Sequence, residues 1–318
     1  MLAAAFTREI DVMRSAVRSA ARLCLAVEAD GPAGYSKDAG EPVTVADFGA
    51  QAVLLGVLAT EYPRDTVIAE EDSRQVTRHG VEGEVAAAVS GVLGRGVSDD
   101  EVLAWIDHRG RGGLRTWAVD PLDGTRGYLR GDQFAVAVGL IVDGMAVAGV
   151  LGCPRLELSG MQGVMVWGGP GMGTYVEALA GGSPRRIAVS TVADPGRARI
   201  LGSVEPSHGD PEFLQGLIDG VGLGGGWVRI DSEAKYAAVA AGIAEVYVRP
   251  RNNPEWRERL WDHAAGIAVL TGAGGTVTDL DGAPLDLTTG AMLTRNRGLL
   301  ATNGAMHQAV LSAVAEST

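Results

Sequence analysis

The segment at residues 120–125, Asp-Pro-Leu-Asp-Gly-Thr, constrains this chain more than any other part of the sequence. It follows directly on an apolar, strand-like run at residues 116–119, and its proline and glycine predict a tight turn. Its two carboxylates can then face one space, with the Leu122 carbonyl beside them and the Thr125 hydroxyl beyond. Hard cations such as Mg²⁺ prefer oxygen ligands of this kind. Taken alone, the segment also fits a turn in which aspartate caps a helix.

Three further segments place acidic residues at the borders of apolar stretches. Glu70 and Glu71 end a short β-prone run, and the alternation of side chains along a strand predicts that they do not both face one site. Asp262 and Asp47 each stand where an apolar helical pattern begins. A helix N-cap is the default interpretation of Asp47, and an N-cap or first-turn acid that of Asp262.

In this order, the segments resemble the lithium-sensitive, Mg²⁺-dependent phosphomonoesterase superfamily that includes inositol monophosphatase. The resemblance extends from about Lys37 to Asp286 and is greatest to the 3′(2′),5′-bisphosphate nucleotidase branch. The stretches that carry it are residues 37–38, 42–47, 124–137, 152–154, 203–208 and 231–236. Arg126 and Tyr128 stand where that branch more often has Lys and Phe. The stretch between Asp72 and Trp117 looks shorter and differently composed.

The resemblance implies an α/β fold with an α+β first half, the layered α-β-α-β-α sandwich of the inositol monophosphatase and fructose-1,6-bisphosphatase type. It also implies an enzyme, a 3′(2′),5′-bisphosphate nucleotidase that uses two or three Mg²⁺ ions per site. Such an enzyme hydrolyses the 3′-phosphate of adenosine 3′,5′-bisphosphate, giving AMP and phosphate. Inhibition by Li⁺ and a role in sulfur metabolism belong to the same expectation.

The resemblance further implies roles for individual residues. The implied metal ligands are Glu70, Asp120, Asp123, Asp262 and the carbonyl of Leu122. The implied catalytic pair is Asp47 and Thr125, which would orient and deprotonate the attacking water. The implied contacts to the nucleotide or its phosphates are Thr125, His208, Ser232, Lys235 and Arg249. These residue types suit the reaction, because metal ions can hold the attacking and leaving oxygens while a hydroxyl relays a proton to a carboxylate.

The charge of the chain points the same way. The formal net charge is −12, so an anionic substrate needs bound cations to approach the carboxylates. The same acidity argues against a nucleic-acid surface. The arginines at 109, 111 and 115 cluster in a glycine-rich stretch that we expect to be a solvated loop. The chain has two lysines, Lys37 and Lys235, and for Lys235 we favour a phosphate contact.

Hydrophobic periodicity predicts how the chain is organised. Residues 1–60 should form two long helices joined by a loop at 30–42, and Asp143-Gly144 between apolar runs should close a β-hairpin. Glycines near residue 182 suggest a boundary. We expect an N-terminal α+β domain at residues 1–183, carrying most metal ligands. An α/β domain at residues 184–318 would carry the nucleotide-binding residues and the last ligand.

Cellular context is an expectation of the same kind. Two cysteines, Cys24 and Cys153, are too few for a disulfide framework, which suits a reducing cytoplasm. No apolar run reaches the roughly 18 residues of a membrane span, and the charged N-terminus does not fit a signal peptide. The expected partner is a small phosphorylated nucleotide, with no nucleic acid and no membrane, bound by a monomer or homodimer.

Several alternatives stay open from the sequence. The sulfated nucleotide could also be a substrate. Within the superfamily, the substrate could instead be an inositol phosphate or a biosynthetic sugar or nucleoside phosphate; residues 130–136 and 231–236 favour the nucleotide. A different class is a non-catalytic protein that binds metal or nucleotide.

Overall fold

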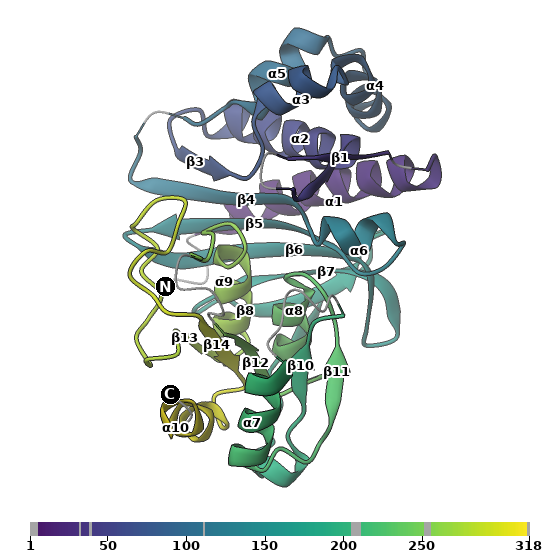
Figure 1. Cartoon of the computed structure of the whole chain (residues 1–318). Coiled ribbons are helices and arrows are strands. Elements are labelled where there is room, and N and C mark those ends of the chain that lie inside the picture. The colour runs from purple at the N-terminus through teal and green to yellow at the C-terminus, as the bar shows by residue number, and fades with distance from the viewer. Residues whose placement is uncertain are drawn as a thin grey trace.

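The computed structural model describes residues 6–31, 33–37, 40–110, 112–204, 211–250 and 256–316. Two sheets, one seven-stranded and one five-stranded, form its framework, and helices cover both faces of each (Figure 1). A short antiparallel hairpin of β1 (Gly34–Ser36) and β2 (Pro42–Thr44) lies apart from them. Among the described residues, no helix combines the length and the apolar character that crossing a membrane requires.

The two predicted N-terminal helices are confirmed as α1 (Thr7–Ala29) and α2 (Val45–Glu61). They pack against each other and on one face of the larger sheet, at the purple end of the colour scale in Figure 1. Cys24 is fully buried in α1. The N-cap interpretation of Asp47 is wrong, because Thr44 caps α2 and Asp47 is the third helical residue of a capping box.

The larger sheet has its strands in the order β3-β4-β5-β6-β7-β8-β9. The strands are β3 (Thr66–Ala69), β4 (Arg115–Asp123), β5 (Ala135–Val142), β6 (Met145–Leu158), β7 (Met161–Gly169), β8 (Gly173–Ala178) and β9 (Arg185–Ile187). The predicted hairpin at Asp143-Gly144 is confirmed between β5 and β6. Only β3 and β4 of this sheet run parallel. The helices between them, which were not predicted, are α3 (Ser73–His79), α4 (Glu82–Leu93) and α5 (Asp99–Ile106).

The segment at residues 120–125 is not the simple turn that its proline suggested. Strand β4 continues through it to Asp123, but its register with β5 breaks between Asp120 and Asp123. Pro121 therefore lies in a β-bulge, where its missing N–H costs no ladder hydrogen bond. The turn follows at Gly124, whose φ of 93° suits glycine, and helix α6 (Thr125–Leu129) begins there.

The smaller sheet has the strand order β11-β10-β12-β14-β13. Its strands are β10 (Ile200–Gly202), β11 (Trp227–Arg229), β12 (Val246–Arg249), β13 (Thr276–Thr278) and β14 (Leu299–Thr302). The remaining helices are α7 (Pro211–Val221), α8 (Ala234–Ala240), α9 (Ala264–Gly272), α10 (His307–Glu316) and the short 3₁₀ helix η2 (Pro195–Arg197).

The layers confirm the predicted α-β-α-β-α sandwich. Helices α1 and α2 cover the outer face of the larger sheet, α8 and α9 lie between the sheets, and α7 and α10 lie outside the smaller one (Figure 1). The larger sheet ends with β9, a few residues beyond the suggested boundary. The division into domains at residue 183 stays a prediction.

Helix α9 sits unusually close to the larger sheet because small residues face it. Gly139 in β5 and Gly149 in β6 lie against the backbone of Ala264 and Ala265. A Cβ added at Gly149 would overlap the carbonyl oxygen of Ala265, which cannot move without shifting the helix. These glycines therefore fix where α9 begins, two residues after Asp262.

This contact generates a stability prediction. Gly149→Ala should lower the free energy of unfolding by about 1–3 kcal/mol, because the added methyl group overpacks the α9 interface. Gly216→Ala is the matched control: Gly216 is helical and nothing lies near its Cβ position. Its replacement should raise stability by about 0.5–1 kcal/mol. Urea denaturation followed by circular dichroism measures both; equal effects would contradict the packing argument.

Candidate active site

A cavity of about 640 Å³ opens where the ends of both sheets meet. Residues from the two halves of the chain line it together. Of the predicted site residues, the ones that line this cavity are Glu70, Asp120, Leu122, Asp123, Thr125, Ser232, Lys235, Arg249 and Asp262. Asp47 lies behind Thr125, and His208 falls outside the described residues. The individual roles of these residues stay predictions.

The strand ends bring the first acidic residues together. In the parallel pair β3 and β4, Ala69 is level with Val119, so the residues that follow, Glu70 and Asp120, are neighbours. The bulge at Pro121 then redirects β4 and brings Asp123 into the same cavity. Glu70 and Asp123 are more than fifty positions apart in the sequence, and they thus meet without sharing a local motif.

Asp47 and Thr125 form a direct hydrogen bond. The Thr125 hydroxyl donates to Oδ1 of Asp47 at 3.0 Å, and Oδ2 of Asp47 accepts from the Thr44 N–H and hydroxyl, both at 2.7 Å. Burial raises the pKa of Asp47 to about 6, although nearby Lys37 opposes that shift. Asp47 can therefore take up a proton near neutral pH, through a hydroxyl that faces the cavity.

Asp120 is buried, Asp123 is half-buried, and both accept a hydrogen bond from the backbone. Leu122 N–H donates to Oδ1 of Asp120 at 3.0 Å, and Glu233 N–H donates to Oδ2 of Asp123. Burial raises the pKa of Asp120 well above its usual value, and the charge of Glu70 adds to this. Burial likewise raises the pKa of Asp123, while Lys235 lowers it.

This donor set fits a hard cation. Its ligand atoms are carboxylate and carbonyl oxygens, which Mg²⁺ prefers. Glu233, which was not predicted, adds a buried carboxylate beside Asp123; its Oε1 has no hydrogen-bond partner among the described residues. Several like charges held together out of water are costly, and a bound cation offsets that cost.

Lys37 corrects the expectation for the acidic run after β3. Its Nζ lies 2.6 Å from Oε1 of Glu70 and also contacts Oε1 of Glu71, so the two carboxylates converge on one ammonium group. Strand alternation does not apply to them, because β3 ends at Ala69. Burial would lower the pKa of Lys37, but Glu70 and Glu71 outweigh it and the pKa rises.

Basic groups line the same cavity. Lys235 is only 6% exposed, and its Nζ lies 5.3 Å from the centre of the Tyr247 ring. Burial lowers the pKa of Lys235 to about 8, against the attraction of Asp123. Ser232 precedes α8 with a φ of 67°, unusual for a residue other than glycine, and its hydroxyl accepts from Ala234 N–H at 3.2 Å.

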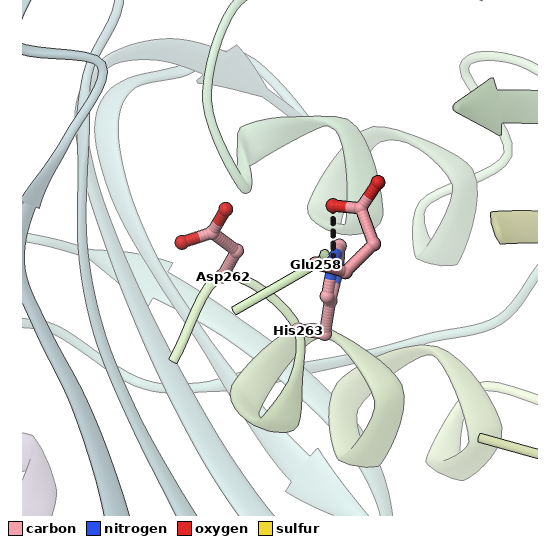
Figure 2. Close-up of side chains that lie close together, drawn as sticks. All are labelled: Glu258, Asp262 and His263. Carbon is pink, nitrogen blue, oxygen red and sulfur yellow. Dashed lines mark hydrogen bonds and ion pairs between the residues drawn. The ribbon is translucent and has the colours of Figure 1, made fainter. Parts of the chain in front are cut away.

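Asp262 belongs to a cluster that the sequence did not reveal. Within the described part of the chain, one group of three side chains has potential metal-ligand atoms that all lie within 4.8 Å of one another. It consists of Glu258, Asp262 and His263 (Figure 2). The other predicted ligands share the cavity but form no such compact triad there. Asp262 is not the N-cap of α9, which is His263. Burial raises the pKa of Asp262 to about 7, opposed by Arg249.

The arginine-rich stretch is a loop that is exposed at residues 112–114, as expected, but its flanking arginines are engaged by the protein. Arg109 is half-buried and donates to the backbone carbonyls of Ile106 and Glu71 at 2.8 Å each. Arg115, the first residue of β4, pairs with Glu9 and Asp65, both at 2.7 Å. Position 111 lies outside the described residues. These two guanidinium groups therefore make contacts at the two ends of β3.

Comparison with known proteins identifies relatives along the whole chain. The sequence matches the profile of the Inositol monophosphatase family over residues 2–318. A 3′(2′),5′-bisphosphate nucleotidase of Oryza sativa is 36% identical over 342 residues, covering 98% of this chain and 95% of the rice protein. A 3′(2′),5′-bisphosphate nucleotidase of Emericella nidulans is 34% identical over 313 residues, covering 88% and 89%.

Solved structures share the fold at lower identity. An IMPase from Thermotoga maritima superposes with a TM-score of 0.70 at 20% identity, covering 98% of both chains. The extragenic suppressor protein suhB from Bartonella henselae gives a TM-score of 0.70 at 21% identity, covering 98% of this chain and all of that one. The layered architecture is therefore that of the IMPase fold.

The buried carboxyls predict a pH-dependent effect of Mg²⁺ on stability. Some carboxyl groups have a higher pKa in the folded than in the unfolded protein. The stability that such a group contributes is greatest below its unfolded pKa. It declines as pH rises from the unfolded pKa to the folded pKa. For Asp262 this interval runs from 3.8 to about 7. With chelator present, the contribution of Asp262 to stability should thus decline across it. Because the cation needs the ionised form, Mg²⁺ should raise Tm more at about pH 8 than at about pH 5.

Differential scanning fluorimetry measures these shifts. Asp262→Asn should lose most of the Mg²⁺-induced increase in Tm at the higher pH. Asp219→Asn, at an exposed position in α7, should keep it. An equal Mg²⁺ effect at both pH values, or in the Asp262 variant, would contradict the assignment.

Proposed function

The chain belongs to the inositol monophosphatase family, and we propose that it is a Mg²⁺-dependent 3′(2′),5′-bisphosphate nucleotidase. Its reaction is hydrolysis of the 3′-phosphate of adenosine 3′,5′-bisphosphate, giving AMP and phosphate. One observation carries the proposal: the hydroxyl of Thr125 is hydrogen-bonded to buried Asp47 at the edge of a cavity that acidic and basic side chains line together. Relatives with the nucleotidase name match almost the full length of the chain.

The acidic side of the cavity would hold the metal ions, two or three per site. The residues assigned to this task are Glu70, Asp120, Asp123, Asp262 and the Leu122 carbonyl. When bound, Mg²⁺ would neutralise charge on the phosphate and lower the pKa of water, so that the water loses its proton more readily and becomes a better nucleophile. Lys37 keeps Glu70 directed by pairing with it.

The proton is handled by the chain itself. The Thr125 hydroxyl donates its hydrogen to Asp47, so its lone pairs are left to accept a hydrogen bond from the attacking water. Asp47, with its pKa near 6, can receive the proton that the water releases. No protein nucleophile is needed, since Cys24 and Cys153 are fully buried in the core.

The basic and aromatic side of the cavity supports a nucleotide as substrate. Lys235 and Arg249 provide cations for phosphate groups. Tyr247, Trp256 and Trp261 line the same cavity and offer flat apolar surface for a purine base, which an inositol ring does not require. The same proposal includes contacts of Ser232 and His208 with the substrate. It also includes a cytoplasmic location and a monomeric or homodimeric state.

Phosphate release tests this function directly. Purified protein with Mg²⁺ should hydrolyse adenosine 3′,5′-bisphosphate faster than inositol 1-phosphate or fructose 1,6-bisphosphate, and Li⁺ should inhibit it. Asp123→Asn should abolish turnover with little change in Tm. A preference for the inositol ester would refute the proposed substrate. No turnover of any ester would refute the enzyme and leave a binding protein.

Lys235→Arg should impair turnover although it conserves the charge. Lys235 is buried against Tyr247, and a planar guanidinium cannot take the place of a compact ammonium there. We expect kcat/KM to fall roughly tenfold, equivalent to about 1.4 kcal/mol. Arg229→Lys, on the exposed edge strand β11, is the control and should leave it unchanged. Wild-type kinetics in the Lys235 variant would remove its assigned phosphate contact.

A further inference from the structure

A chain of four buried or half-buried side chains leads to Asp262. The Tyr236 hydroxyl lies 2.9 Å from Nδ1 of His263, and Nε2 of His263 lies 3.1 Å from Oε2 of Glu258. The same Glu258 oxygen lies 3.1 Å from Nε of Arg249, whose Nη1 lies 3.3 Å from Oδ2 of Asp262. Figure 2 shows the bond between His263 and Glu258, with the Asp262 carboxylate apart from that pair.

Each hydrogen bond from Tyr236 to Glu258 in this network has a defined donor and acceptor. Burial would raise the pKa of Glu258, but Arg249 outweighs it and the pKa falls to about 2, so the carboxylate only accepts. Nε2 of His263 must then carry a hydrogen, and in neutral His263 Nδ1 accepts from the Tyr236 hydroxyl. Tyr236 and His263 are fully buried and Glu258 is nearly so. The arrangement is therefore a fixed internal network.

The cluster in Figure 2 is not itself a cation site. Both nitrogens of His263 are engaged, one by Tyr236 and one by Glu258. The positive charge between the two carboxylates is already provided by Arg249. A metal ion at that point would have to displace a guanidinium group held by two ion pairs.

We propose that Glu258, held by His263 and Tyr236, is a positioning residue that anchors Arg249 and so keeps Asp262 available to a cation. This inference rests on the metal-binding part of the proposed function. The anchor contact, from Nε to Glu258, is 3.1 Å long, and the contact to Asp262 is 3.3 Å. Without the charge of Glu258, Arg249 closes on Asp262 and competes with the metal for it.

The same network joins the substrate side of the cavity to the metal side. Tyr236 directly follows Lys235 in α8, and its ring lies against Gly266 in α9, where a Cβ would overlap it. The start of α9 also positions Asp262. Tyr236 thus locks the helix that carries Lys235 to the segment that carries the last carboxylate.

The test measures metal binding without substrate. Isothermal titration of the full-length protein with Mn²⁺ should show about tenfold weaker binding for Glu258→Gln, the usual size of effect for groups that orient metal ligands. Tyr236→Phe removes one hydroxyl and should weaken binding roughly twofold to fivefold. Thr174→Val is the matched control: its buried hydroxyl donates to Val269 O in the same helix α9, at 2.6 Å. It should lower Tm but leave Mn²⁺ affinity unchanged.

A double-mutant cycle tests whether Glu258 acts through Arg249. In an Arg249→Met background, Glu258→Gln should no longer change Mn²⁺ affinity. Three results would overturn the inference. The effects of Glu258→Gln and Arg249→Met on Mn²⁺ affinity could be additive, or Glu258→Gln and Tyr236→Phe could both keep wild-type Mn²⁺ affinity. Thr174→Val could also lose as much Mn²⁺ affinity as they do. If Glu258→Gln does not fold, Tyr236→Phe against Thr174→Val decides alone. The wild-type protein could bind Mn²⁺ in a manner that depends on Glu258 and yet show no phosphatase activity. That result would refute the proposed substrate chemistry and leave the role of Glu258 standing.

Discussion

The structure depends on keeping several buried or half-buried carboxylates together. Asp120 and Asp123 reach the cavity from one strand, and Asp262 reaches it from the segment before α9, in the helical layer between the sheets. Folding must offset the repulsion and the lost hydration of these groups. It does so with cationic side chains of the chain itself, Lys37 and Arg249, with backbone N–H donors, and by leaving a space that a hard cation fits.

Part of the fold and of the candidate site could be predicted, because it is encoded by residues that are neighbours in the sequence. The helical spacing in α1 and the Asp-Gly turn between β5 and β6 each depend on neighbouring residues, and both were correct. The layered fold and the gathering of Glu70 with Asp123 followed from a resemblance that spans the chain. The β-bulge at Pro121 did not follow, since strand pairing on both sides of it overrides the turn tendency of proline and glycine.

What could not be predicted depends on contacts between distant segments. Glu258 has no sequence signal of its own; it matters because Arg249 and His263 meet at its carboxylate. Lys37 lies in a loop, and only the end of β3 reveals that it neutralises two acids at once. The helices between β3 and β4 were not predicted; α4 and α5 pack on α2, and α3 packs on α5.

The hydrogen bond between Thr125 and Asp47 joins residues 78 positions apart. Closing a loop of that length adds only a modest entropic cost, so the pair depends on the packing of α2 against β4, which brings its two ends together. The contact is therefore a product of tertiary packing and not of local sequence. A substitution that loosens this packing would separate the two side chains without altering either of them.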